Sequence, residues 1–453
     1  MTHEDKIKQI EAWLHEKHID DIELMLPDYA GIARGKAMPR AKFIEGMRSR
    51  SLRLPESLFG ITVNGEFCFN KHLHETERDM IIVPDLDTMV MTPWQNEPTA
   101  SVICDVETEA GEAIVLSPRQ VLRRVLDLYA AKGWKPIVAP EFEFYLIDRQ
   151  KDLSRPPKPP IGKSGVREVG TEPFSIDGVD EFGALFDDLY DYCEAQNIEI
   201  DTLIHEAGPA QFELNVNHGA AMAVADQSFY IKRVIRQVAL HHGMFATFMA
   251  RPYPESFGSA MHLHQSVIDI KSGDNIFAGK EGADTDIFLA HIAGLQKYMP
   301  SVMPMFAPFV NSYMRLAGAL SAPTNLHWAR ENRSVGLRVP SGGRAARRIE
   351  NRVAGSDANP YLAIAASLAC GYLGMQEALT PSEALSGSAY DTTSRSLPSH
   401  FLDGIGKMDR CKPIREVLGD GFVDTYLQIK RTEYESYSSF LSPWETTYLM
   451  LNV

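Results

Sequence analysis

The pattern of apolar positions changes from helical to strand-like in the first part of the chain. Apolar side chains recur at helical spacing over residues 5–18 and predict a helix. From Asp21 to about Asp105, the apolar residues form short runs broken by Gly, Pro and Asp. Residues 22–27 and 80–84 have the composition of strands. The pattern therefore predicts a small β-rich unit at this end.

A helix start signal follows. Ser117 is a good helix-capping residue and Pro118 suits the first helical position, so we predict a helix from there to about Ala131. We place a domain boundary just before this helix. The predicted domains are residues 1–112 and 113–453.

Beyond this helix, apolar strands alternate with helical segments. Residues 152–170 are rich in Pro, Gly and charge and predict a loop. Asn359 is followed by proline and predicts the cap of a helix over residues 361–378. The segment 386–411 is polar, so we expect it to cross the surface as a loop, with Tyr390 as an ordinary surface tyrosine.

The composition is that of a soluble globular protein. The 453 residues are 44% hydrophobic and 23% charged, which fits two domains. The formal net charge of −15 argues against a nucleic-acid-binding protein; it fits simple solubility and is compatible with a cationic substrate. The five cysteines form no C-x-x-C pair, so no disulfide framework or thiolate zinc site is expected. We expect no signal peptide and no membrane span, and a cytoplasmic location.

Two glutamates interrupt an apolar strand over residues 137–147. Alternate side chains of a strand share a face, so Glu141 and Glu143 point one way while Phe142 and Phe144 point the other. Two like charges roughly 6–7 Å apart repel one another unless a cation lies beside them. The segment is therefore either a strand with a solvated polar face or part of a cation site.

Two further segments place polar ligands among strand-forming residues. Glu206 precedes a Gly-Pro turn and Glu213 lies in the run after it, either as surface carboxylates or as ligands. His262, His264 and Ser266 share one strand face by their period-two spacing. Because imidazole binds metals and hydrogen-bonds nucleotides, two histidines on one face favour a functional interpretation.

Arginine is concentrated between residues 330 and 352 of this acidic chain. The positions are Arg330, Arg333, Arg338, Arg344, Arg347, Arg348 and Arg352. Arginine is the preferred bidentate partner of phosphate and carboxylate, and a solvated basic surface is the alternative. Carboxylates with one imidazole suit Mg²⁺ or Mn²⁺, and metals with arginines around a triphosphate are what phosphoryl transfer needs. The set predicts an ATP site without a P-loop.

Seven motifs in fixed order carry a family resemblance from about residue 20 to the C-terminus. They are Glu-x-Glu, His-Glu…Gln-x-Glu, Met-His-x-His-x-Ser, Asn-Ser-Tyr-x-Arg, Asn-Arg-Ser…Arg-x-Pro, Arg-Arg-Ile-Glu-x-Arg and Ala-Asn-Pro-Tyr-Leu. In this order they resemble the glutamine synthetase superfamily. The resemblance implies an α+β fold: an N-terminal β-grasp domain and a catalytic domain of helices around a curved antiparallel sheet. It also implies a dodecamer of two hexameric rings, with active sites between neighbouring subunits.

The resemblance also implies roles for individual residues, with ATP, glutamate and an amine as the reactants. The implied ligands of one metal are Glu143, Glu206 and Glu213, and those of the other are Glu141, His262 and Glu350. The implied ATP contacts are His264, Ser266 and Arg348. The implied glutamate contacts are Arg315 and Gly258, and the phosphate and γ-carboxyl contacts are Arg333, Arg338 and Arg352.

The chain departs from the family where ammonium is bound. A Phe-Asp-Gly-Ser-Ser loop is replaced by residues 59–65, which lack the aspartate, and a flap glutamate is replaced by Ser321. Phe257 stands where the family has asparagine. A neutral lining leaves room for an alkyl amine, and Asp79 and Glu206 are our candidates for steering the amine. The amine is protonated at neutral pH, so a base must take its proton, and the sequence does not name that base.

This pattern is similar to that of the γ-glutamylpolyamine synthetases. We therefore expect ATP-dependent ligation of the γ-carboxyl of glutamate to a putrescine-like diamine or polyamine, through γ-glutamyl phosphate, in polyamine catabolism. The alternatives are a glutamine synthetase that uses ammonia, a γ-glutamyl ligase for another amine such as ethanolamine, and a non-catalytic relative. The last of these predicts broken metal sites, whereas all six implied ligand positions are present.

Overall fold

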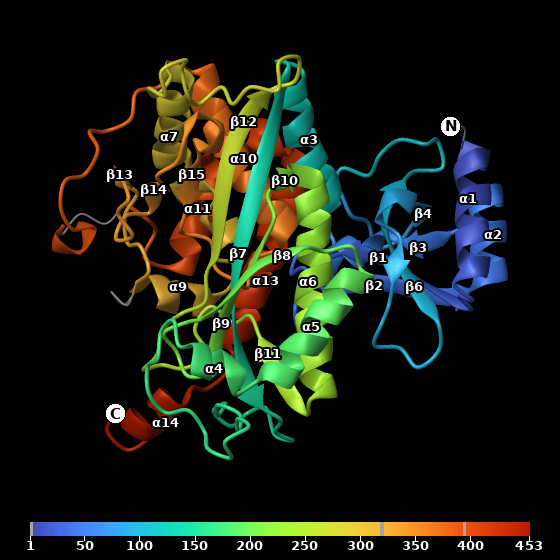
Figure 1. Ribbon diagram of the computed structural model, residues 1–453, viewed down its shortest axis with the longest axis horizontal. Coiled ribbons are helices and arrows are strands. Elements are labelled where there is room, and N and C mark those ends of the chain that lie inside the picture. Colours follow the sequence, from blue (N-terminus) through green and yellow to red (C-terminus); the bar gives the residue numbers. More distant parts are fainter. Residues whose placement is uncertain (1–2, 318–320, 393–395) are drawn as a thin grey trace.

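Two β-sheets with helices packed around them form an α+β structure, as predicted (Figure 1). The computed structural model describes residues 3–317, 321–392 and 396–453. Among these residues, no helix is both long and apolar enough to cross a membrane.

The N-terminal sheet has the order β2-β1-β6-β4-β3, with β5 paired to β6. Its elements are α1 (His3–Glu16), β1 (Asp21–Pro27), β2 (Ala33–Pro39), α2 (Arg40–Ser49), β3 (Arg53–Pro55), β4 (Asp79–Pro84), β5 (Val90–Met91) and β6 (Thr99–Glu107). Strand β1 pairs antiparallel with β2 and parallel with β6, and α2 packs against β1 and β2. A helix laid across such strands is the predicted β-grasp arrangement.

The larger sheet has the order β13-β14-β15-β12-β7-β9-β8, with β10 and β11 also paired to β7. Its strands are β7 (Trp134–Asp148), β8 (Ile200–His205), β9 (Gln211–Val216), β10 (Gly219–Ala220), β11 (Met244–Thr247), β12 (Met261–Asp269), β13 (Trp328–Arg330), β14 (Leu337–Val339) and β15 (Ile349–Asn351). The long antiparallel pair of β7 and β12 forms its centre (Figure 1). Phe142 and Phe144 are fully buried, so one face of β7 packs on the core and leaves Glu141 and Glu143 on the other.

Helices cover this sheet and separate it from the N-terminal sheet. They are α3 (Pro118–Ala130), α4 (Ile176–Asp180), α5 (Gly183–Ala195), α6 (Ala221–His241), α7 (Asp286–Tyr298), α8 (Met303–Phe306), α9 (Val310–Ala317), α10 (Pro360–Gln376), α11 (Phe401–Arg410), α12 (Lys412–Leu418), α13 (Asp420–Ser438) and α14 (Pro443–Tyr448). In Figure 1, α3 and α6 stand between β7 and the blue N-terminal sheet. Helix α10 is almost entirely buried, which explains its run of small apolar residues.

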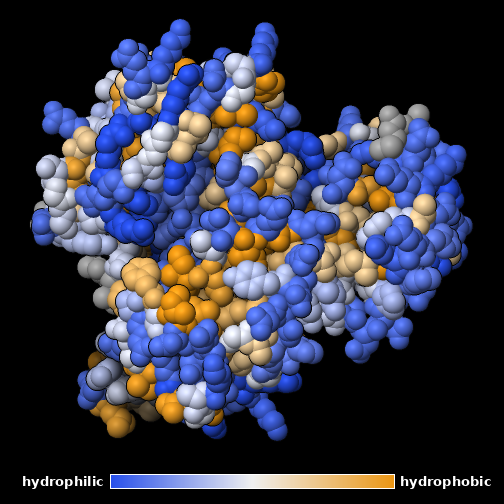
Figure 2. All heavy atoms as spheres, viewed as in Figure 1, coloured by the Kyte–Doolittle hydropathy of each residue, from blue (hydrophilic) through white to orange (hydrophobic). Residues whose placement is uncertain are grey.

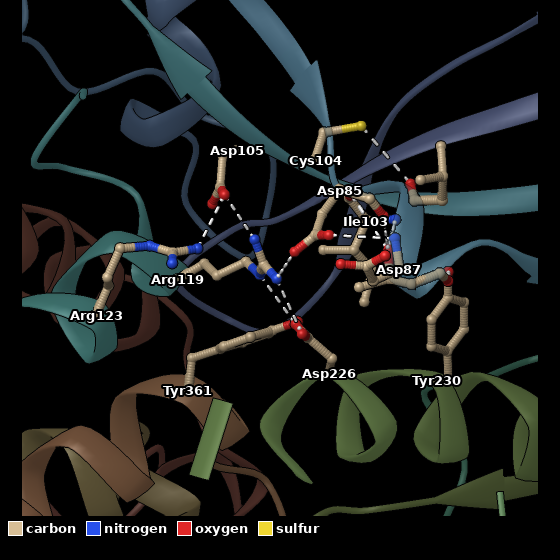
Figure 3. Close-up of polar contacts among 12 residues, drawn as sticks. Asp85, Asp87, Ile103, Cys104, Asp105, Arg119, Arg123, Asp226, Tyr230 and Tyr361 are labelled. Atoms are coloured by element: carbon tan, nitrogen blue, oxygen red, sulfur yellow. Dashed lines mark hydrogen bonds and ion pairs between the residues drawn. The ribbon is translucent and has the colours of Figure 1, made fainter. Parts of the chain in front are cut away.

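A buried arginine joins the two parts of the molecule (Figure 3). Arg119, in the first turn of α3, is 1% exposed. It donates to Asp85, directly after β4, at 2.5 Å and to Asp105 in β6 at 2.7 Å. It also donates to both carboxylate oxygens of Asp226 in α6, each at 3.0 Å. The Tyr361 hydroxyl of α10 also donates to Asp226, at 2.7 Å. We call these five residues the Arg119 cluster.

Several local predictions differ in detail from the structure. The first helix ends at Glu16, and the backbone of His18 is left-handed. Ser117 precedes α3, but its side chain makes no capping hydrogen bond and its buried hydroxyl has no partner among the described residues. Asn359 does cap α10, accepting from the backbone N–H of Leu362 at 3.2 Å.

The segment 386–411 is not a continuous surface loop, so that prediction was wrong. Its end forms the amphipathic helix α11, which buries Phe401, Ile405 and Met408 against the core, while residues 393–395 lie outside the described part. The predicted boundary between residues 112 and 113 falls between β6 and α3 and stays a prediction.

Candidate functional site

Strand register brings the predicted metal ligands together. Across β7 and its two neighbours, the directly opposed pairs are Glu141 with His262 and Glu143 with Glu213, and one strand further on His264 lies opposite Glu350. Opposed residues of antiparallel strands have closely spaced side chains on one face. Four adjacent strands, β9, β7, β12 and β15, therefore build one continuous polar surface.

A pocket of about 620 Å³ lies over this surface. Figure 2 shows a hollow with a hydrophilic rim on this part of the molecule, beside β12 and β15. The predicted residues that line the pocket are Glu141, Glu143, Glu206, Glu213, Gly258, His262, Arg315, Ser321, Arg333, Arg338 and Arg352. Glu350 lies directly behind it, 1% exposed, and contacts His262, Arg338 and Arg352.

The predicted nucleotide contacts line a second, adjoining pocket of about 360 Å³. His264, Ser266 and Arg348 all lie in its wall, and Arg348 donates to His264 at 3.1 Å. Glu141 and Asn215 line both pockets. The site therefore consists of two chambers that meet at Glu141.

Three carboxyl groups of the larger pocket resist ionisation. Burial, with the nearby Glu206 and Glu213, raises the pKa of Glu143 well above its ordinary value. Burial, with Glu141 and Glu206, raises the pKa of Glu213 to about 8, and burial likewise raises the pKa of Glu206. Like charges held close together in a desolvated pocket produce this shift, and a bound cation reverses it.

The other ligand group has a compensated charge. Burial opposes ionisation of Glu141, but hydrogen bonds from His262 at 3.1 Å and His264 at 2.8 Å outweigh it and hold the pKa low. Burial also opposes ionisation of Glu350, but Arg352 lowers its pKa to about 2. Burial lowers the pKa of His262, which favours the neutral imidazole that a metal requires.

The donor atoms present fit a hard divalent cation. Among the described residues, two groups place their ligand atoms within 4.8 Å of one another: Glu141, His264 and Glu350, and Glu141, Glu213 and His262. Carboxylate oxygens with one imidazole suit Mg²⁺ or Mn²⁺. Glu141 belongs to both groups, whereas the sequence prediction gave it to one metal only.

The arginines of the larger pocket present donors to an anion. Arg315 is fully buried in the core side of the wall, and its guanidinium donates to the carbonyls of Arg352 and Val353 at 3.0 and 2.8 Å. The Nε atoms of Arg338 and Arg352 are buried and have no partner among the described residues. Buried donors without a partner cost stability unless a ligand accepts from them.

Gly258 is required by the close approach of Arg315. A Cβ atom at this position would lie 2.5 Å from Cγ of Arg315 and 2.7 Å from the carbonyl oxygen of Ala250. The absence of a side chain leaves the Gly258 backbone open to the pocket that it lines.

Ser321 and Phe257 place uncharged side chains in the pocket wall, and the two residues predicted to steer the amine lie apart. Ser321 and Phe257 line the pocket near Glu206, whereas Asp79 is exposed at the start of β4 and lines neither chamber. Asn64 hydrogen-bonds Glu66 and Ser436 on the surface. A contribution from Asp79 therefore requires a second subunit and stays a prediction.

Phe174, Ile204 and Tyr390 are among the pocket-wall residues that the sequence interpretation missed. Phe174 has a left-handed backbone and a 72% exposed side chain. Tyr390 was expected on a plain surface loop, but its segment is held over the site because Ser334 accepts from the backbone N–H of Ala389 at 2.8 Å. An apolar residue directly before His205 and Glu206 was the available signal for Ile204.

Comparison with known proteins decides the family. The model of the glutamine synthetase catalytic domain matches residues 115–449. The chain belongs to the glutamine synthetase family. As a member of that family it is an ATP-dependent carboxylate–amine ligase.

Relatives of this family member match it over nearly their full length. It is 32% identical to glutamate–isopropylamine ligase of a Pseudomonas species (98% of each chain), and 32% identical to γ-glutamylputrescine synthetase PuuA of Escherichia coli (95% of this chain, 92% of the relative). It is 30% identical to glutamine synthetase of Thermus thermophilus, over 87% and 91% of the chains. A solved structure titled apo GmaS has the same fold, with a TM-score of 0.83, 24% identity, and 97% and 99% coverage.

Proposed function

We propose that this protein ligates the γ-carboxyl of glutamate to a primary amine, with putrescine-like diamines and polyamines as the first candidates. The observation that carries the proposal is the combination of a complete set of predicted ligands with a neutral acceptor lining at Ser321 and Phe257. The named activities of the Pseudomonas and Escherichia coli relatives, on isopropylamine and putrescine, support an amine larger than ammonia.

Glutamate would bind in the larger chamber. Arg315 would receive its α-carboxylate and the open backbone at Gly258 its amino group, since both line the pocket. The γ-carboxylate would then face Arg338 and Arg352, whose buried Nε donors have no partner among the described residues. Fixing all three groups holds the γ-oxygen in line with the phosphoryl group to be transferred.

ATP would bind in the adjoining chamber, with its triphosphate directed past Glu141. His264, Ser266 and Arg348 would hold it there, and Arg333 and Arg352 would stabilise the charge that develops as the γ-phosphoryl moves to the glutamate carboxylate. The residues that would hold divalent cations are Glu141, Glu143, Glu206, Glu213, His262 and Glu350. When bound, Mg²⁺ or Mn²⁺ neutralises phosphate oxygens.

In the second step, the amine nitrogen attacks the acyl carbon of γ-glutamyl phosphate. The C–N bond forms, the bond from the acyl carbon to the phosphate oxygen breaks, and phosphate leaves with that electron pair. Amines with a pKa of about 10 arrive protonated, so a base must accept the proton. Glu206 lines the same pocket and is our candidate for that role.

The second candidate is ammonia as the acceptor. Glutamine synthetases at 30% identity match most of this chain, which favours keeping this alternative. Ethanolamine is a third acceptor to include. A role in polyamine breakdown, a dodecamer of two rings and a cytoplasmic location remain predictions, and analytical ultracentrifugation tests the assembly.

The deciding experiment measures phosphate release from ATP, Mg²⁺ and glutamate with one acceptor per reaction: ammonium, putrescine, spermidine, isopropylamine or ethanolamine. We expect turnover with putrescine or spermidine and negligible turnover with ammonium. Turnover with ammonium alone would make the protein a glutamine synthetase. Turnover with isopropylamine alone would keep amine ligation and exclude diamines.

A further inference from the structure

A buried lysine lies behind the larger chamber and has no part in the roles described above. Lys232, in the middle of α6, is 5% exposed. Its ammonium donates to the carbonyls of Ser356 and Ala358 at 2.6 and 3.1 Å and lies over the ring of Phe248. Burial lowers the pKa of Lys232 to about 7, so keeping this ammonium costs free energy and calls for a compensating role.

The carbonyls that Lys232 holds belong to the loop between β15 and α10, residues 352–359. The start of this loop is held from the other side, because Arg315 donates to the carbonyls of Arg352 and Val353. The loop also pairs with the strand that leads from Gly258, since the N–H of Ser356 donates to the carbonyl of Ser259 at 3.0 Å. Lys232 and Arg315 therefore both hold one short loop that borders the larger chamber.

Asp357, in the same loop, connects the two cations electrostatically. Asp357 is half-buried, its Oδ1 atom is buried, and this burial raises its pKa. One carboxylate oxygen accepts from Ser312 at 2.6 Å, while Oδ1 has no partner among the described residues. Burial lowers the pKa of both Lys232 and Arg315, and in both cases the charge of Asp357 opposes that lowering.

Without the charge of Lys232 or of Arg315, the Asp357 carboxylate would have only the remaining one of these two cations nearby. Without the charge of Lys232, the free Oδ1 of Asp357 competes for the Arg315 guanidinium. Arg315 would then turn from the pocket wall toward the Asp357 carboxylate, because an unpaired buried carboxylate is costly. Its donors would be less available to the carboxylate of a substrate.

We propose that Lys232 is a positioning residue for glutamate binding: its ammonium holds loop 352–359 and offsets the charge of Asp357, which keeps Arg315 in place in the pocket wall to bind the substrate carboxylate. This inference rests on the proposed role of Arg315 in binding glutamate. Lys232 itself touches neither substrate nor metal ligands.

The test compares the kinetics of K232M with those of the wild type, at saturating putrescine or whichever acceptor proves active. We expect the KM for glutamate to rise about tenfold while kcat and the KM for ATP change by less than about twofold, which is the signature of lost binding. D357N added to K232M is expected to return the KM for glutamate to within about threefold of the wild type. A general loss of packing would not be repaired by that second substitution.

Lys430 provides a matched control. It is also a fully buried lysine, bonded to Glu433 at 2.7 Å and packed on aromatic rings, but it lines neither chamber. K430M is expected to lower the melting temperature without raising the KM for glutamate. If K232M does not fold, D357N alone tests the idea, because it removes the competitor of Arg315 and should lower the KM for glutamate.

Three results would overturn the positioning role while the wild type remains a glutamate-dependent ligase. They are an unchanged KM for glutamate in K232M, an equal rise of this KM in K430M, and a KM that D357N does not restore in K232M. Should K232M not fold, a D357N single variant with an unchanged KM would overturn it. A wild type that releases no phosphate in response to glutamate would instead remove the proposed function, and this inference with it.

Discussion

Two groups of buried and half-buried carboxylates in the described part of the molecule are built in opposite ways. In the Arg119 cluster, the guanidinium of one arginine lies within 3.0 Å of a carboxylate oxygen of each of three aspartates. In the larger pocket, Glu206 and Glu213 have no lysine or arginine in ion-pair contact among the described residues. They accept from neutral donors instead, Ala207 N–H and the Asn215 amide.

The difference separates a structural charge cluster from one that needs a ligand. The Arg119 cluster carries its own cation and joins the N-terminal sheet to helices α3, α6 and α10 (Figure 3). Burial and the nearby like charges raise the pKa values of the pocket carboxylates, and an added cation or proton offsets this repulsion. Residue type alone does not distinguish the two clusters, but the presence of an internal counter-charge does.

Removing the counter-charge of the Arg119 cluster should have the largest effect. R119M leaves the buried Asp226 and the half-buried Asp85 and Asp105 around an apolar side chain, and we expect the free energy of unfolding to fall by roughly 3–5 kcal/mol. Urea denaturation followed by circular dichroism measures it. R123M is the matched control: Arg123 also binds Asp105 but its side chain is 40% exposed, so we expect a loss of less than about 1 kcal/mol. Equal losses would contradict the comparison.

The same contrast explains what the sequence could predict. Apart from Glu206, which follows β8, the predicted ligands of the pocket lie on strands. Their motifs are local, and the period-two spacing of Glu141 with Glu143 and of His262 with His264 made the shared faces visible in the chain. The Arg119 cluster joins positions 85, 105, 119, 226 and 361, which no local pattern connects. It depends on how α3, α6 and α10 pack against the N-terminal sheet.

Other misses have the same physical origin. The polar composition of segment 386–411 hid α11, because only three of its side chains are apolar anchors and their partners are distant in sequence. The segment around Tyr390 is held beside Asn332, since the Asn332 amide donates to the carbonyl of Gly387 at 2.8 Å. A capping signal at Ser117 was present, but tertiary packing buried its hydroxyl.

Removing one carboxylate from the pocket should have opposite effects on activity and stability. E213Q is expected to lower kcat/KM by roughly 100-fold, about 2.7 kcal/mol, because a predicted metal ligand is lost. Without Mg²⁺ at pH 8, the same change should raise the free energy of unfolding by about 1 kcal/mol, since a carboxyl with a pKa of about 8 no longer ionises among like charges. The control is E433Q, which breaks the buried pair with Lys430 and should destabilise. A destabilised E213Q would contradict this interpretation of the pocket.

Magnesium should stabilise the protein more at high pH than at low pH. The pKa of Glu213 is raised from 4.5 to about 8 in the folded protein, so its contribution to stability is complete below pH 4.5 and is lost as the pH rises to 8. A bound cation offsets that loss. We expect the Mg²⁺-induced gain in unfolding free energy to be about 2 kcal/mol larger at pH 8 than at pH 6. Thermal unfolding at both pH values, with Ca²⁺-free Mg²⁺ and with chelator, measures it, and an equal gain at both would count against a carboxylate site.

A change on the acceptor side should have the smallest effect. Ser321 is predicted to stand where the family has a flap glutamate, and it lines the pocket with a left-handed backbone at φ 61°. S321E adds a negative charge that attracts the ammonium ion, so we expect the ratio of kcat/KM for ammonium to that for putrescine to rise about tenfold, near 1.4 kcal/mol. S321Q has nearly the same size without the charge and should leave the ratio unchanged. If S321Q shifts the ratio as much as S321E, space rather than charge sets the choice of amine. The neutral lining would then not explain a preference for putrescine over ammonium.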